Sequence, residues 1–73
     1  MTYHCKIVPV TKYEGMEIKD VHELIKLIEI LNATMDTMTG EILFENYLQM
    51  YKGIAICDMY GLALEVLDTQ PSK

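Results

Sequence analysis

Histidine and cysteine are the first candidates for chemistry in this 73-residue sequence, because both side chains bind metals and act in catalysis. The four candidates are His4, Cys5, His22 and Cys57. Zinc ligands often recur as Cys-x-x-Cys or His-Glu-x-x-His, and the sequence contains neither spacing. His4 and Cys5 are neighbours in a stretch with strand character, so they would point to opposite faces. We therefore predict no metal site and expect both cysteines to be small buried apolar residues.

Nucleophilic and phosphate chemistry have little support in the sequence. A reactive thiol needs a neighbouring base, and Cys57 with His22 is the one conceivable pair. The only serine is Ser72, close to the C-terminus. No glycine-rich phosphate loop is present. We predict neither a nucleophile nor a cofactor.

Two carboxylate pairs, Glu41 with Glu45 and Asp58 with Glu65, could in principle serve acid–base catalysis. Such catalysis needs an enclosed pocket, and a chain of this length leaves little room for one. We predict instead that these carboxylates belong to a solvated acidic face and that the protein is not an enzyme.

The stretch from Asp20 to Met35 has the clearest periodicity and must position the rest of the chain. Its apolar stripe has helical spacing and comprises Val21, Leu24, Ile25, Ile28, Leu31 and Met35. Asp20 with Glu23 matches a capping-box pattern at its start. We predict a central helix over this stretch.

The N-terminal part predicts a hairpin before that helix. Residues 3–10 alternate like a strand, with Pro9 at its end because proline cannot donate to a sheet ladder. Residues 12–15 suit a turn with Gly15 in the left-handed conformation. Residues 16–18 could return as a second short strand.

The middle of the chain predicts a second helix over residues 41–51, after a turn over residues 36–40. Thr39 is the expected N-cap and Gly53 the expected terminator. A strand over residues 41–48 is the open alternative.

The C-terminal part favours a second hairpin, with strands 54–57 and 62–67 around the turn Asp58–Gly61. A helix over residues 62–69 is the alternative, and residues 70–73 are expected to form a frayed tail. The predicted fold is a single α+β domain over residues 1–73, in the order ββααββ, with two helices on an antiparallel sheet.

The composition predicts surface for a partner. About 60% of the unfolded chain's surface is buried in a domain this small, yet 51% of the residues are hydrophobic. Some apolar surface should therefore remain outside, where a larger protein or a second copy could cover it.

The charge is unevenly distributed. The net charge is −5, and residues 36–72 hold six acidic residues against one lysine. The sequence has no arginine, which argues against direct binding of nucleic acid. An acidic half suits a partner with a basic surface. No leader or uncharged membrane-length apolar run is apparent, so we expect a cytoplasmic protein that binds no membrane.

These patterns favour a non-enzymatic regulator or inhibitor of a larger protein machine. Tyrosine and methionine at turn positions are suited to interfaces. The predicted contact residues are Tyr13, Glu41, Glu45, Met59, Tyr60 and Glu65. Small acidic single-domain proteins are frequent among phage and mobile-element products, which favours an inhibitor of a host enzyme or defence system. The alternative is a self-associating structural or ligand-binding homodimer.

Overall fold

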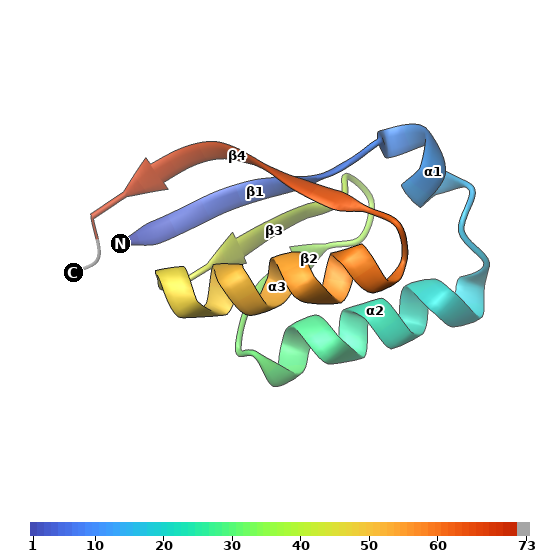
Figure 1. Cartoon of the computed structure of the whole chain (residues 1–73), viewed down its shortest axis with the longest axis horizontal. Coiled ribbons are helices and arrows are strands. Elements are labelled where there is room, and N and C mark those ends of the chain that lie inside the picture. Colours follow the sequence, from blue (N-terminus) through green and yellow to red (C-terminus); the bar gives the residue numbers. More distant parts are fainter. Residues whose placement is uncertain (72–73) are drawn as a thin grey trace.

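The computed structural model describes residues 1–71 and contains a four-stranded antiparallel sheet covered on one face by helices. The elements in chain order are β1 (Thr2–Val8), α1 (Val10–Glu14), α2 (Ile18–Ile30), β2 (Thr34–Asp36), β3 (Glu41–Phe44), α3 (Tyr47–Met59) and β4 (Ala63–Gln70). The strand order is β2-β3-β1-β4, and Figure 1 shows α2 and α3 on the same side of this sheet. If the short α1 is set aside, this is the ferredoxin-like split βαβ connectivity.

The alternation of side chains along β1 and β3 separates the two faces of the sheet. The residues that point toward the helices are fully or almost fully buried; they are Cys5, Ile7, Ile42 and Phe44. The intervening residues point away from the helices, onto a face that none of the described helices covers. We call this second surface the open face.

Helix α2 confirms in part the central helix that was predicted from Asp20 to Met35. It begins at Ile18 rather than Asp20, because Glu17 is the N-cap and Asp20 lies in the first turn. Leu24 and Ile28 are completely buried, as the apolar stripe predicts. The helix ends at Ile30, and Asn32 follows with a φ of 64°. Met35 therefore lies in β2 instead of continuing the helix.

Helix α3 occupies the region predicted to contain the end of one helix and a strand. Its N-cap is Asn46, whose Oδ1 accepts a hydrogen bond of 2.9 Å from the backbone amide of Gln49. Gly53 does not terminate the helix but lies buried in its middle. The helix continues through residues 54–57 to Met59, so the predicted strand over 54–57 is wrong.

The N-terminal hairpin is also wrong. After β1 the chain turns into the short helix α1, with Pro9 as its N-cap and Gly15 as its C-cap. Gly15 has a φ of −85°, so it does not adopt the left-handed conformation. Ile18 starts α2, and residues 16–18 do not return as a strand.

The predictions for the fold class, the element order and the C-terminal part are partly confirmed and partly wrong. The α+β class is confirmed. The strand predicted over residues 62–67 is present as β4, over Ala63–Gln70, so the alternative C-terminal helix is wrong. The predicted C-terminal hairpin is also wrong, because β4 pairs with β1. The strand alternative for the start of residues 41–48 is confirmed as β3. The order ββααββ is wrong, because the chain runs β1-α1-α2-β2-β3-α3-β4. The frayed tail predicted over residues 70–73 is wrong at Gln70, which pairs with Thr2 at the end of β4. Residues 72–73 of that tail lie outside the described part of the chain.

Among residues 1–71, no helix combines the length and apolar character that crossing a membrane requires.

Candidate functional site

The open face brings together side chains from all four strands. In the β1–β3 and β1–β4 pairings, Lys6 lies opposite both Glu41 and Glu65, and His4 lies opposite both Leu43 and Asp68. In the β2–β3 pairing, Asp36 lies opposite Glu41. Directly paired residues of antiparallel strands share a face. Thr2 pairs with Gln70 in the same sheet, so the sheet gathers residues that are up to 68 positions apart in the sequence.

A wide hollow of about 330 Å³ lies on the open face. It is open to solvent and is lined by both polar and apolar groups. The lining residues are Thr2, His4, Thr34, Asp36, Glu41, Ile42, Leu43, Asp68 and Gln70. Leu43 is 43% exposed, so it offers an apolar contact beside the carboxylates of Asp36, Glu41 and Asp68.

His4 and Glu41 form a side-chain hydrogen bond within this hollow. His4 Nε2 lies 2.5 Å from Oε1 of Glu41, across the β1–β3 pair. An ionised carboxylate only accepts, so Nε2 is the donor in this pair. The two side chains are 41% and 32% exposed, which leaves both accessible to a ligand. The bond fixes the direction of the Glu41 carboxylate at the centre of the open face.

The open face is strongly acidic. It carries four carboxylates, namely Asp36, Glu41, Glu65 and Asp68, against the single lysine Lys6 and His4. All four carboxylates come from the acidic half that the charge distribution singled out, residues 36–72. The fold thus converts an uneven charge along the chain into one acidic surface, which favours positively charged ligands.

The predicted contact residues do not form one surface. Glu41 and Glu65 lie together on the open face, on either side of Lys6. Glu45 follows β3 at the start of α3, and its backbone amide donates to Gln49 Oε1 at 2.8 Å. Met59 and Tyr60 lie at the C-terminal end of α3, in the layer of helices on the other side of the sheet.

Tyr13 is not an exposed anchor at a hairpin tip. It lies in α1 and is only 6% exposed, with its ring against Gly40. Its hydroxyl donates a 2.6 Å hydrogen bond to the backbone carbonyl of Thr37. Burial and the nearby Asp36 raise the pKa of Tyr13. Tyr13 therefore links α1 to the β2–β3 connection. This structural role was not predicted, because residues 12–15 were expected to form a turn.

Tyr60 is half-buried and belongs partly to the core. It packs against the buried cluster, and its hydroxyl lies 3.3 Å from Glu23 Oε2 of α2. Met59, by contrast, is 74% exposed. Of the three tip residues predicted as anchors, Met59 alone is freely accessible, and it lies at a helix end rather than in a hairpin.

Cys5 and Cys57 are free, completely buried thiols, which confirms the prediction that they behave as small apolar residues. Burial, with a smaller contribution from Cys5, raises the pKa of Cys57 to about 12. The thiol is therefore protonated at neutral pH, whereas a nucleophilic cysteine requires a lowered pKa. Within residues 1–71 no three or more His, Cys, Asp or Glu side chains are grouped so that they could hold a metal ion.

A second surface was missed by the sequence reasoning. The side of α3 opposite its buried residues is mostly apolar, and we call it the α3 outer face. It consists of Tyr47, Leu48, Tyr51, Lys52, Ile54, Ala55, Asp58 and Met59, all of them exposed. Assigning residues 54–57 to a strand divided this face between two elements and hid its continuity.

Comparison with known protein families, curated proteins and solved structures gives no match.

Proposed function

We propose that the protein is a small non-enzymatic regulator or inhibitor that binds a basic segment of a larger protein on its open face. The observation that supports this most is that three carboxylates, Asp36, Glu41 and Asp68, line one hollow together with the exposed Leu43, with Glu65 on the same face of the sheet. A surface of one charge sign accelerates the encounter with an oppositely charged partner and helps to select it.

The chemistry of the hollow suits a lysine or arginine side chain. Such side chains lay their aliphatic stems along apolar surface while the charged head stays in a polar environment. On the open face, the stem would contact Leu43 and the head would reach Asp36, Glu41 or Asp68 at the wall. Hydrogen bonds between such charged groups are stronger than those between neutral ones. A flat acidic surface without Leu43 would offer the charge alone.

The position of the open face also supports binding rather than a structural role. In the described part of the chain, helices cover the opposite face of the sheet, and β1 runs through the middle of the open face with Lys6 as its one lysine. The face is therefore available to a partner without any rearrangement of the fold, as is usual for preorganised interfaces.

The test is affinity capture from cells of the native host with two matched variants. One triple variant, Asp36→Asn, Glu65→Gln and Asp68→Asn, removes three charges from the open face. The control, Glu14→Gln, Glu17→Gln and Glu29→Gln, removes three exposed charges from the helical side. We expect the first variant to lose its partner and the control to retain it. Equal capture by both, or equal loss from both, would contradict the proposal.

The alternative of a self-associating protein would instead use the α3 outer face, where Leu48, Tyr51 and Met59 are exposed.

A further inference from the structure

We propose that an extended, positively charged segment of the partner adds to the free side of β4 as a fifth strand of the sheet. This inference rests on the proposed function for the positive charge of the partner, and it adds how the backbone of that partner is held. The segment we infer carries lysine or arginine at alternate positions, with apolar residues between them.

Strand β4 is a long edge strand. It contains eight residues and lies at the end of the strand order β2-β3-β1-β4, so among the described strands β1 is its one neighbour. Figure 1 shows β4 along the outside of the sheet. All residues of β4 except Leu64 are exposed. The other edge offers much less backbone, because β2 is only three residues long.

The hydrogen bonds of the sheet show which backbone groups of β4 point to its free side. The amide of Ile7 in β1 donates at 2.9 Å to the carbonyl of the residue just before β3. Successive residues of a strand turn their backbone groups to opposite neighbours, so Lys6 is turned toward β4. Glu65 lies opposite Lys6 and is turned back toward β1, which leaves Leu64 and Val66 turned outward. Their donors and acceptors are those that a further strand pairs with.

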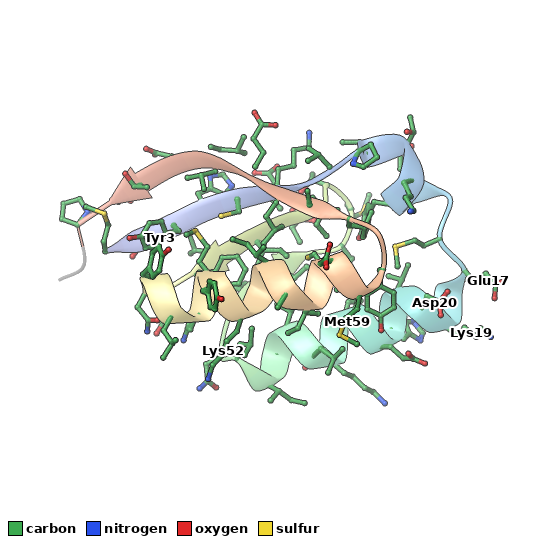
Figure 2. All side chains as sticks on the ribbon, viewed as in Figure 1. Tyr3, Glu17, Lys19, Asp20, Lys52 and Met59 are labelled. Carbon is green, nitrogen blue, oxygen red and sulfur yellow. The ribbon has the colours of Figure 1, made fainter. Side chains whose placement is uncertain are left out.

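The helical side of this edge is apolar and only partly covered. Figure 2 shows Tyr3 of β1 directed toward the start of α3, where its ring centroid lies 6.1 Å from that of Tyr47. Cys5 points to the same side and is completely buried. Val66 lies opposite Cys5 and is nevertheless 46% exposed, because it lies at the edge of the sheet. An apolar side chain on a fifth strand would cover Val66.

On the open face the same edge is acidic. Glu65 and Asp68 are three residues apart, but they lie opposite Lys6 and His4, which are two residues apart, because Leu67 is an extra residue at a bulge. A fifth strand would therefore place basic side chains beside both carboxylates when these are two residues apart in its own sequence. Opposite charges at paired positions of neighbouring strands are favourable.

The charges of β4 argue against a second copy of the chain as the fifth strand. If two β4 strands paired antiparallel along their whole length, Ala63 would lie opposite Gln70 and Glu65 opposite Asp68. Like charges at directly opposite positions are unfavourable. Edge strands that avoid all pairing often carry lysine or proline, and β4 contains neither. The edge therefore disfavours its own copy and favours a basic strand.

N-methylation of a single backbone amide in chemically synthesised protein tests the strand addition. The probe is a peptide of alternating lysine and valine that matches the eight residues of β4, and a peptide with all its lysines before all its valines is the control of equal composition. We expect the alternating peptide to bind more tightly. N-methylation of Val66 should raise its dissociation constant at least about tenfold, because the amide can no longer donate and the methyl group blocks the edge.

The matched control is N-methylation of Met35 in β2, the other edge strand. Cys5 is turned toward β3 like Ile7, so Ile42 opposite Cys5 is turned toward β1, and Met35 opposite Ile42 is turned outward. This modification should leave peptide binding unchanged, and circular dichroism should show the same fold for both modified proteins. Equal effects of the two methyl groups, equal binding of the two peptides, or no binding of the alternating peptide would overturn the proposal.

Amide hydrogen exchange of the unmodified protein provides a second measurement. The alternating peptide should protect the amides of Leu64 and Val66 from exchange and leave that of Met35 unchanged. Exchange at Leu64 and Val66 that the peptide does not slow would contradict the fifth strand. Protection that rises with protein concentration in the absence of peptide would show that a second copy occupies the edge, and would overturn the choice of partner.

The triple variant Asp36→Asn, Glu65→Gln and Asp68→Asn separates this inference from the proposed function. Loss of the alternating peptide from both the triple variant and the N-methyl-Val66 protein supports the two together. Loss from the triple variant alone would overturn the fifth strand and leave the acidic open face as the binding site. Loss from the N-methyl-Val66 protein alone would support the fifth strand and contradict the proposed role of the carboxylates.

Discussion

Gly53 in the middle of α3 lies directly against the ring of Phe44 on β3: a Cβ at Gly53 would be 2.5 Å from Cε1 of Phe44. Phe44 is completely buried, so the ring has no free space to move into. Glycine is normally unfavourable inside a helix by roughly 1 kcal/mol relative to alanine. Here it permits the close approach of α3 to the sheet.

We therefore expect Gly53→Ala to lower the free energy of unfolding, by about 1–3 kcal/mol, despite the better helix propensity of alanine. Urea denaturation measures the change. Phe44→Leu removes the ring atoms that would clash, so the double variant should be less destabilised than the sum of the two single variants. A Gly53→Ala protein more stable than the wild type would show that the contact does not restrict α3.

The N-cap of α3 gives a second prediction. Asn46→Ala removes the acceptor for the amide of Gln49 and should cost about 1 kcal/mol of stability. Asn46→Asp keeps an acceptor oxygen in place and is the matched control. In thermal denaturation, the wild type and the aspartate variant should have similar melting temperatures, and both should melt at a higher temperature than the alanine variant. An alanine variant as stable as the aspartate variant would mean that the cap contributes nothing.

The bond from Tyr13 to Thr37 gives a third prediction. Tyr13→Phe retains the buried ring and removes the hydroxyl, so we expect a loss of about 1 kcal/mol. Tyr13→Ala also opens a cavity beside Gly40 and should cost about 3–5 kcal/mol. Urea denaturation of the three proteins measures both steps. Equal losses from the two variants would show that the ring does not pack as described.

Cys57 gives a prediction about pH. Burial raises its pKa from 9.0 to about 12, so between these values the unfolded chain loses the proton while the folded chain keeps it. Ionisation then favours the unfolded state, and stability should fall as the pH rises above about 9. At pH 10.5 the ionisation of Cys57 in the unfolded chain should lower the free energy of unfolding by on the order of 2 kcal/mol.

The comparison for that prediction is Cys57→Ala, which cannot ionise. Its free energy of unfolding should fall less steeply than that of the wild type between pH 8 and pH 10.5, because the other ionisable groups are the same in both proteins. Parallel stability curves for the two proteins would indicate that Cys57 is not protected from solvent. The same burial should make both native thiols slow to react with Ellman's reagent.

The sequence allowed the central helix, the first strand and the last strand to be predicted, because their patterns are local. The apolar stripe with Leu24 and Ile28 needs only the helical period, and β1 needs only alternation. The short strand β3 was harder to recognise, since the four residues Glu41–Phe44 join smoothly to the pattern of α3. The Asn46-x-x-Gln49 spacing is a capping signal that would have separated the two elements.

The sequence indicated the negative charge of the candidate site but not which residues meet there. The excess of carboxylates in residues 36–72 indicated an acidic surface. The pairs suggested by the sequence were Glu41 with Glu45 and Asp58 with Glu65, whereas the sheet places Glu41 and Glu65 on either side of Lys6. His4 could not be assigned to the site, because its neighbours there come from β3 and β4 through long-range pairing. Gly53 was taken as a helix end because its partner, Phe44, lies on another element.

The measurement that tests the central claim most directly is carbodiimide labelling of carboxylates, read by mass spectrometry, with and without the captured partner. Binding on the open face predicts that Asp36, Glu65 and Asp68 are protected from labelling in the complex, while Glu14, Glu17 and Glu29 on the helical side react as in the free protein. Protection of the helical carboxylates with unchanged labelling of the open face would contradict the account.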